Sequence, residues 1–380
     1  MIKQKPGFVL IFSLLSMGIV TILTQQLMKS VSVGIAFSRQ MVLREQVKMF
    51  VYGGIAIATA QLEQCYPEEK KKQGVDPAAG QQSSAQPQAP KRPFSFKTFI
   101  LTVLPHLNRW QTFELTDKID GVDAQIKVCI VAEEGKIPFT QVFDEPVREL
   151  TDPAHGFLQQ FPSAKKGSSS DFVTKFTAFL KGRTHRIVDI STLLPFAQQV
   201  KVPLWYAPPE FPTRRTVAGE VKNEKGKPVP AACALQDLFT LWGQGGNLNP
   251  LLLSNALCIL SGLRPPQPND AQKRKDQYKQ LAENYDKIKS LKGDELWKAL
   301  GALYDAKPKL SAEFNTLFSL EVEPRFYSVL SCATVAGVTQ QVIAILEHVS
   351  PTVAPAERRE QRQKKKEIQP LFAIRRLYWL

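Results

Sequence analysis

The sequence predicts an α+β protein in which a long N-terminal helix precedes an antiparallel sheet that is interrupted by a large inserted helical part. Three observations lead to this prediction. An apolar run near the N-terminus continues as a helical pattern over residues 8–64, strand-like runs occur within 94–144 and again within 311–380, and the intervening segment 145–310 has helical periodicity. Strand runs separated from helix runs are typical of α+β proteins.

The beginning of the chain predicts a membrane helix that stays attached to the rest of the protein. A basic leader, residues 1–7, is followed by the apolar run 8–23. A secretory signal peptide ends at a small-residue cleavage site, whereas this helical pattern continues without one. At about 16 residues, the run is slightly shorter than the roughly 20 that span a bilayer. Lys3 and Lys5 precede the run, so the positive-inside rule places the C-terminal part outside the cytoplasm.

Beyond Lys29 the pattern becomes amphipathic and continues to about Gln64. A single helix over residues 8–64 would be roughly 85 Å long at ~1.5 Å per residue. Gly53 and Gly54 are candidate positions for a bend. We therefore expect a stalk that packs one face on another part of the protein and leaves the other face in water.

A flexible loop is predicted for residues 65–93, because this stretch is rich in Pro, Gln, Ser and Gly and cannot form a core. Strand patterns follow it. They cover residues 94–104, 109–116, 124–132 and 136–143. Glu134 and Gly135 mark a turn before the last of these strands. Glu133 and Glu134 are adjacent in that turn, so we expect their side chains to point apart, on the solvent face of a hairpin.

Helical patterns dominate the inserted part. They appear between 145 and 201, on both sides of the segment 243–250, and over 269–305, where two polar amphipathic helices are expected. Gly293 should end the first of these two helices and Asp294 should cap the second. Strand patterns return in 318–349 and 368–380. The chain therefore alternates β, a large α insertion, and β again.

Asn247 and Asn249, in the sequence GQGGNLNP, are predicted to have a structural role. An Asn side chain accepts hydrogen bonds from the free N–H groups at the start of a helix, and Pro250 suits the first helical turn. We expect helix capping here rather than contact with a ligand.

The net charge of +14 raises nucleic acid or anionic lipid as partners. Its distribution argues against nucleic acid. Much of the excess lies in Lys70–Lys72, Lys273–Lys275 and Arg358–Lys366, which are predicted loops without the interleaved aromatic residues on which bases stack. Solvated loop charge is the preferred interpretation, and nucleic-acid binding is not favoured.

No catalytic or metal-binding pattern is present. The cysteines, Cys65, Cys129, Cys233, Cys258 and Cys332, are widely separated, and the histidines, His106, His155, His185 and His348, lie in different segments. Three of the cysteines, at 129, 258 and 332, lie in apolar stretches and should be buried thiols. Without a nucleophile beside a base, or a phosphate-binding glycine loop, we expect neither enzymatic activity nor a bound metal.

The leader resembles the prepilin pattern, in which a peptidase cuts after a glycine that borders a basic leader. The resemblance makes Gly7 the cleavage site and Phe8 the new N-terminus. Most such subunits carry a glutamate at the fifth mature position, which neutralises the N-terminal amine of a neighbouring subunit; here that position is Phe12. A carboxylate without a partner is costly in lipid, so the absence of this glutamate suits a subunit that has no other subunit above it. The departure implies a tip or initiator subunit.

The order of segments resembles the type II secretion minor pseudopilin K family. Four stretches carry the likeness: 44–62, similar to an Ala-rich upper helix; 126–144, a strand and turn with Gly135; 246–257, an Asn-rich segment with Asn247 and Asn249; and 318–349, similar to the late strands. The resemblance implies a prepilin leader (1–7), a membrane and stalk helix (8–64), a flexible loop (65–93), a pilin-like β part (94–144), an inserted helical domain (145–310) and a closing β part (311–380).

The resemblance implies a noncatalytic subunit at the tip of a pseudopilus, supporting protein export. It would be a single-pass protein of the inner membrane, with its head in the periplasm. Implied partners are the prepilin peptidase, the inner-membrane secretion platform, membrane lipid, and other minor pseudopilins through the N-terminal helices, where the small residues Ser13, Ser16 and Gly18 would assist close packing.

Calcium is the one ion that the resemblance raises, because family members bind it through acidic clusters in the inserted domain. Calcium takes six or more oxygen ligands. The carboxylates of residues 145–201, at 145, 149, 152, 171 and 189, are too scattered to form such a site. We therefore expect no cofactor.

Two other functions remain open on the sequence. One is a minor pilin of a DNA-uptake or adhesive type IV pilus, whose basic loop around Lys364–Lys366 would contact DNA or a surface. The other is a plain signal-anchored periplasmic protein.

Overall fold

The structure is a computed structural model. It describes residues 6–66, 94–144, 149–151, 158, 169–183, 187–200, 202, 204–205, 221–222, 228–229, 234–242, 247–261, 263, 271–304, 317–349 and 371–380. The segments predicted as a leader and as a flexible loop lie largely outside these residues. The predicted fold class is confirmed, since a long N-terminal helix, an antiparallel sheet and further helices make up an α+β protein.

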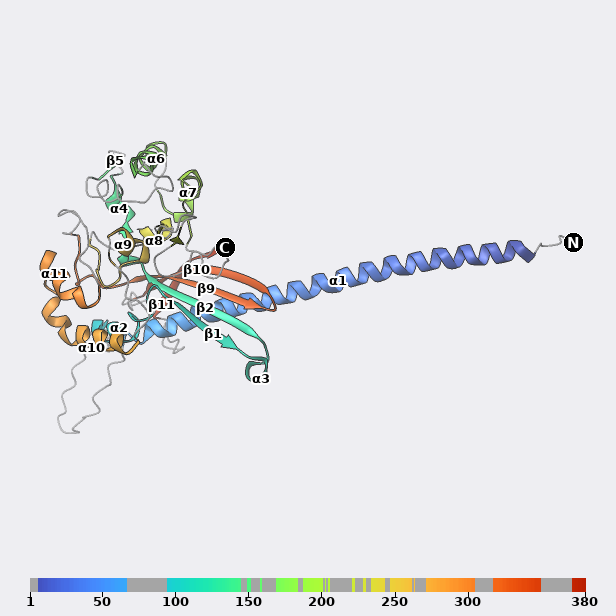
Figure 1. Cartoon of the computed structure of the whole chain (residues 1–380), viewed down its shortest axis with the longest axis horizontal. Helices are drawn as coiled ribbons and strands as arrows, with labels where there is room; N and C mark the ends of the chain where they lie inside the picture. Colours follow the sequence, from blue (N-terminus) through green and yellow to red (C-terminus); the bar gives the residue numbers. More distant parts are fainter. Residues whose placement is uncertain are drawn as a thin grey trace, which may run out of the picture.

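Helix α1 (Pro6–Glu63) is continuous over 58 residues and projects from the head as a single rod (Figure 1). At ~1.5 Å per residue its length is about 87 Å. The helix passes through Gly53 and Gly54 without interruption, and no Pro follows its first residue to break it.

One antiparallel sheet of five strands forms the centre of the head, in the order β1-β2-β9-β10-β11. Its strands are β1 (Trp110–Leu115), β2 (Ala124–Ala132), β9 (Phe326–Val335), β10 (Val338–His348) and β11 (Phe372–Trp379). β2 pairs with β9 across the interruption, with Ala132 opposite Tyr327. The chain leaves this sheet after Ala132 and returns at Phe326, so the interruption is wider than the predicted 145–310.

Two short helices, α2 (Phe96–Thr102) and α3 (Asp117–Asp120), lie outside the insertion. The insertion itself contains η1 (Glu133–Gly135), β3 (Ile137–Pro138), α4 (Phe139–Val142), β4 (Phe143–Asp144), β5 (Glu149–Leu150), α6 (Ser169–Lys181), η2 (Ile190–Leu193), α7 (Leu194–Val200), β6 (Val221–Lys222), β7 (Pro228–Val229), α8 (Leu235–Leu238), β8 (Phe239–Thr240), α9 (Asn255–Leu260), α10 (Ala271–Ile288), α11 (Gly293–Ala299) and η3 (Leu300–Ala302).

The last part of α1 lies on one face of the sheet, against β2, β9 and β10. Its buried side chains recur every three or four residues and therefore share one face of the helix. They are Val47, Val51, Ile55, Ala58 and Leu62. Burial of this apolar stripe against the strands fixes the stalk to the head.

Gly54 marks the closest approach of α1 to the sheet. A Cβ at this position would overlap Ser331 Oγ and would lie 3.1 Å from Val128 and 3.2 Å from Ile126. The Ser331 hydroxyl, on β9, donates a 2.8 Å hydrogen bond to the Val51 carbonyl. The glycine therefore lets a backbone-to-sheet contact form that any larger residue would displace.

The other face of the sheet is covered by the insertion. A second apolar cluster contains Cys129, Val131, Leu330, Ile343 and Ile345, with Trp205 and Trp242 of the insertion packed against it. Since both faces are covered, the central strands read as nearly continuous apolar runs rather than as alternating ones.

The strand predicted for residues 94–104 is wrong, because this segment forms α2. The Ser95 side chain caps the helix by accepting a hydrogen bond from the Thr98 N–H. The buried residues Phe99, Ile100 and Val103 have helical rather than alternating spacing. The strand was predicted because the residues before Phe99 alternate between Phe and polar side chains over a short stretch.

Two further predicted boundaries differ from the structure. The strand expected at 136–143 is reduced to the two residues of β3, after which the chain turns helical in α4. Helix α10 ends at Ile288, and α11 begins at Gly293, so Gly293 does not end the first helix. Asp294 lies in the first turn of α11 and is not its N-cap. An acidic residue there still favours the helix dipole.

We predict that Gly54→Ala lowers the free energy of unfolding by about 1–3 kcal/mol, because the added Cβ overpacks the contact with Ser331. The neighbouring glycine provides a matched control. A Cβ on Gly53 meets nothing within 4 Å. Gly53→Ala should therefore raise the free energy of unfolding by about 0.5–1 kcal/mol through helix propensity. Urea unfolding of the detergent-solubilised chain measures both, and equal effects would contradict the close-approach role of Gly54.

Candidate functional site

The outward face of α1 is the largest exposed apolar surface that the described residues present. From Leu10 to Val42 every described residue of the helix is exposed. By length and composition α1 is apolar enough to cross a membrane, and its most apolar window is not buried. The exposed apolar residues do not stop at membrane length, because Met49 and Tyr52 are 71% and 42% exposed beside the head.

These exposed residues continue one stripe on the side of α1 opposite to the sheet. With 3.6 residues per turn, positions separated by three or four residues share a face. The stripe runs through Ser13, Ser16, Val20, Leu27, Val31, Gly34, Ser38, Val42 and Met49. Tyr52 lies at its border, where its ring packs edge-on against Trp379 of β11 with a centroid separation of 5.8 Å. Glu45 interrupts the stripe, and its carboxylate pairs with Lys48 at 2.6 Å. The expectation that the second face of the stalk stays in water without a partner is therefore too simple, because this face is largely apolar.

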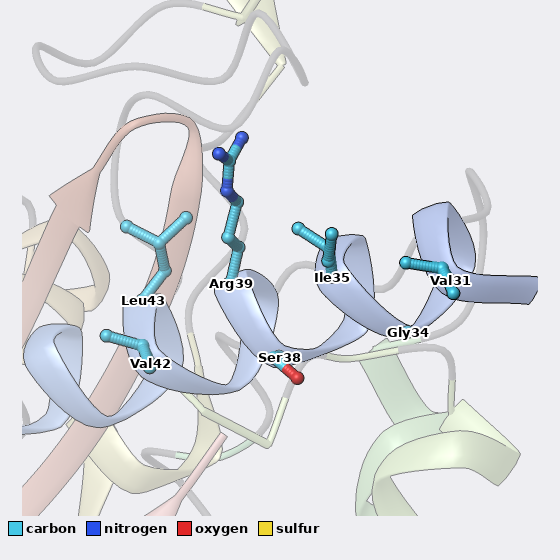
Figure 2. Close-up of a pocket in the computed structure, with 7 residues that line it drawn as sticks. All are labelled: Val31, Gly34, Ile35, Ser38, Arg39, Val42 and Leu43. Carbon is cyan, nitrogen blue, oxygen red and sulfur yellow. The ribbon is translucent and has the colours of Figure 1, made fainter. Parts of the chain in front are cut away.

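A shallow groove of about 640 Å³ lies on this stripe (Figure 2). All of its lining residues come from α1: Val31, Gly34, Ile35, Ser38, Arg39, Val42 and Leu43. Gly34 and Ser38 leave the backbone uncovered between larger neighbours, which allows a second helix to approach closely. Arg39 extends away from the helix between Ile35 and Leu43 (Figure 2).

The structure divides the small residues predicted to assist packing into two faces. Ser13 and Ser16 are three residues apart and lie on the outward stripe, whereas Gly18 follows Ser16 by two residues and faces another direction. The Ser13 hydroxyl donates to the Leu10 carbonyl and the Ser16 hydroxyl to the Ser13 carbonyl, both at 2.9 Å. Such back-bonding satisfies a hydroxyl within an apolar environment.

The residues of the predicted cleavage site and fifth mature position lie at the beginning of the rod. Gly7 and Phe8 fall within the first turns of α1. Phe12 is 65% exposed. The structure places these residues but does not test their predicted roles.

A buried polar cluster at the root of the insertion was not predicted. Glu133 is only 2% exposed, contrary to the expected solvent face. Its Oε1 accepts hydrogen bonds from Lys136 Nζ and from Ser328 Oγ on β9, and its Oε2 accepts one from Thr240 Oγ1 on β8 at 2.5 Å. A buried carboxylate needs such partners, because its desolvation is otherwise costly.

Glu134 was also expected in solvent and is also buried, at 4% exposure. Its Oε1 accepts the backbone N–H groups of Arg325 and Phe326, at 2.8 and 2.9 Å, where the chain enters β9. Burial raises the pKa of Glu134 to about 8, against the lowering effect of these two hydrogen bonds and together with repulsion from Glu133. Asp237, on α8, accepts the N–H of Ala256, and burial raises its pKa as well.

Two predicted motif residues, Gly135 and Asn249, are brought together at this root. A Cβ on Gly135 would overlap the Leu252 carbonyl, and the Asn249 N–H donates to the Glu134 carbonyl at 3.2 Å. Asn249 is fully buried; its Oδ1 accepts from the Leu251 N–H and its Nδ2 donates to the Val322 carbonyl. Asn249 therefore stabilises a turn and does not cap the start of a helix, which begins only at Asn255.

Asn247 has a different environment from Asn249. Its side chain is exposed. Since α9 begins only at Asn255, capping of a helix by Asn247 is wrong. Tertiary contacts, rather than a following helix, decide the role of this segment.

The described residues contain no group of His, Cys, Asp and Glu that could hold a metal ion. Of the five scattered carboxylates, Asp189 is the one whose side chain is described. It accepts the N–H of Ser191 and the hydroxyl of Tyr378 and pairs with Arg376 at 3.5 Å. These contacts do not fit a calcium site, which requires many free oxygens.

The remaining residues noted in the sequence offer no catalytic grouping within the described ranges. Cys129, Cys258 and Cys332 are buried free thiols, as predicted, and so is Cys65. His348 stacks on Tyr66 with a ring separation of 4.0 Å. His106 is exposed, and Lys273–Lys275, predicted as a loop, lie in the first turns of α10. Outside the described residues lie Cys233, His155, His185, Lys70–Lys72 and Arg358–Lys366.

No protein-family model matches the chain, and no curated protein does. Among solved structures, the chain is similar to one from the crystal structure of the GspK-GspI-GspJ complex of the enterotoxigenic Escherichia coli type 2 secretion system. The identity is 11%, the match covers 90% of this chain and 99% of that chain, and the TM-score is 0.33. At this identity and TM-score, the similarity does not indicate a function.

We predict that Asn249→Ala destabilises the protein by about 1–3 kcal/mol for each buried partner left without a hydrogen bond. The Leu251 N–H and the Val322 carbonyl are the groups concerned. Asn247→Ala is the matched control and should change stability by less than about 0.5 kcal/mol, because its side chain is exposed. Thermal unfolding of both variants measures the difference. A neutral Asn249→Ala would show that the turn does not depend on this side chain.

Proposed function

We propose that this protein is a noncatalytic minor pseudopilin at the tip of a type II secretion pseudopilus, where it supports protein export. The outward apolar stripe of α1 carries the proposal. A helix that only anchored the head would need an apolar surface no longer than the bilayer is thick. Here the stripe continues past the membrane-length segment to Met49, which is 71% exposed beside the head, and so fits a second helix along its length.

The chemistry of the stripe suits helix association inside and outside a membrane. Small residues at Ser13, Ser16, Gly34 and Ser38 permit close backbone approach, which drives helix packing in lipid. The partners would be the N-terminal helices of other minor pseudopilins. Outside the lipid, burial of Met49 against such a helix would add hydrophobic stabilisation.

The proposal of a tip position rests on the N-terminal segment and on the size of the head. Phe12 occupies the position where most related subunits carry a glutamate. A subunit with no neighbour above it has no amine for that glutamate to neutralise. The wide insertion between β2 and β9 enlarges the head, which would hinder another subunit from stacking above it.

A noncatalytic role is favoured by the burial of the acidic residues. Glu133, Glu134 and Asp237 are at most 5% exposed, and each accepts hydrogen bonds that attach one segment of the fold to another. Side chains that no substrate can reach do not serve as a general acid or base. The same proposal places the protein in the inner membrane with its head in the periplasm, where it would meet the prepilin peptidase, lipid and the secretion platform.

The outward stripe can be tested by photocrosslinking from two valines of the stalk. Val31 lies on the stripe, whereas Val33, two residues later, points to the opposite side, and the two are similarly exposed at 53% and 62%. We expect a photoreactive residue at Val31 to crosslink to the N-terminal helix of another prepilin-like subunit severalfold, roughly tenfold, more than one at Val33, because only the stripe would lie within reach of that helix.

The measurement uses membranes from cells that express the full chain together with the other prepilin-like subunits of its secretion system. Mass spectrometry of the crosslinked products identifies the partner. Equal crosslinking from both valines, or recovery of the chain as an isolated monomer, would contradict assembly through this face.

Processing of the N-terminus provides a separate test. We expect the mature N-terminal peptide to begin at Phe8, often methylated, because Gly7 fits the residue after which prepilin peptidases cut. The mass of this peptide from membranes measures it. An intact Met1 would favour a plain signal-anchored protein instead.

A further inference from the structure

We propose that the root of the insertion is a proton-dependent latch: protonated Glu134 holds the insertion onto β9, and ionisation of Glu134 loosens this attachment while α1 and the five-stranded sheet stay folded. The inference concerns the stability of the head and is independent of the proposed assembly. It rests on the geometry of three buried carboxyl groups and on the charges around them.

Each carboxyl group of the root joins segments that are distant in sequence. Glu133 joins η1 to β8 and β9 through Thr240 and Ser328. Glu134 joins η1 to the entry of β9 through two backbone N–H groups. Asp237 joins α8 to the first turn of α9 through Ala256. Together these contacts attach the insertion where it leaves and re-enters the sheet.

The charges of the root do not balance when all three carboxyl groups are ionised. Within the described residues, one ammonium group, that of Lys136, faces them, and it pairs with Glu133. Glu134 Oε1 accepts two N–H groups, whereas its buried Oε2 has no hydrogen-bond partner among the described residues. Two carboxylates would therefore be left without a cation in a dry site, which favours a neutral Glu134.

Several titratable and charged groups face Glu134 from its own turn and from the elements packed against it. They are Glu133, Tyr327 on β9 and Tyr66 after α1. Of the charged groups nearby, Lys136 pairs with Glu133 and the Arg325 guanidinium pairs with Glu347, whereas Glu323 acts on the two tyrosines and Asp237 acts on Glu133 and Lys136. Burial raises the pKa values of Tyr66 and Tyr327 far above neutrality, so both remain uncharged. The raised pKa of Glu134, about 8, brings the change of its charge close to neutral pH.

The direction of the pH effect follows from the pKa of Glu134, which rises from 4.5 to about 8 on folding. A raised pKa means that the folded root binds a proton that the opened root releases. The stabilisation is fully present below pH 4.5 and is lost as the pH rises through about 8. Above about pH 8, a further rise in pH does not change the stability through Glu134, because its carboxyl group is then ionised in both the closed and the opened root.

The loosening should be local because α1 does not use the root. The helix packs on the sheet through its own apolar stripe and through the Ser331–Val51 hydrogen bond. β10 pairs with β9 along its whole length, from Val338–Val335 to Glu347–Phe326. By contrast, the segment 249–256 is bound directly to the root, because the N–H groups of Asn249, Ser254 and Ala256 donate to the Glu134 carbonyl, the Gly135 carbonyl and the Asp237 carboxyl group.

Hydrogen–deuterium exchange of the full chain in detergent micelles tests the latch. After correction for chemical exchange, we expect amide protection in residues 247–261 to fall about tenfold per pH unit between pH 6 and pH 7.5 and to level off above about pH 8. Protection in β10, residues 338–348, should not follow this slope. Because both regions belong to one wild-type chain, this comparison does not require a variant to fold.

Glu134→Gln should remove most of this pH dependence, since glutamine keeps the acceptor for Arg325 and Phe326 but never ionises. Glu283→Gln, at an exposed position on α10, is the matched control and should retain the wild-type slope. The proposal is overturned if the wild-type and Glu134→Gln chains show the same slope in residues 247–261, or if β10 loses protection together with them.

Discussion

The close packing of α1 on the sheet is the contact on which the rest of the structure depends. Gly54 brings the helix backbone against β9, and the Ser331 hydroxyl fixes the rotation of the helix by bonding to the Val51 carbonyl. Once one face is committed to the sheet, 3.6 residues per turn decide what the opposite face displays. The outward apolar stripe is thus oriented by the head, although most of it lies outside the head.

The insertion is attached at its root by buried polar contacts in addition to the apolar packing on the sheet. Glu133, Glu134 and Asp237 accept hydrogen bonds from β8, β9 and α9. Each hydrogen bond therefore also fixes which residue of the partner segment lies at the root. Hydrophobic burial is non-directional, whereas these hydrogen bonds specify partners. Their location under the sheet, away from α1, separates the attachment of the insertion from that of the stalk.

Much of the architecture could be predicted because it depends on local periodicity. The patterns at 109–116, 124–132 and 318–349 correspond to β1, β2, β9 and β10, and the long helical pattern corresponds to α1. The failures occurred where local patterns were short or ambiguous. Residues 94–104 alternate like a strand at first, but the N-cap at Ser95 and the burial of Phe99 make the segment a helix.

The sequence by itself determined the rod, the strands and their interruption, and the absence of a recognisable catalytic motif, since each depends on residues close together in the chain. The tertiary structure decided that Glu133 and Glu134 are buried, that Gly135 meets the turn at Asn249, and that the outward face of α1 has no partner within the described head. These features depend on contacts between segments more than a hundred residues apart, and periodicity does not encode which distant segment will supply a hydrogen-bond partner.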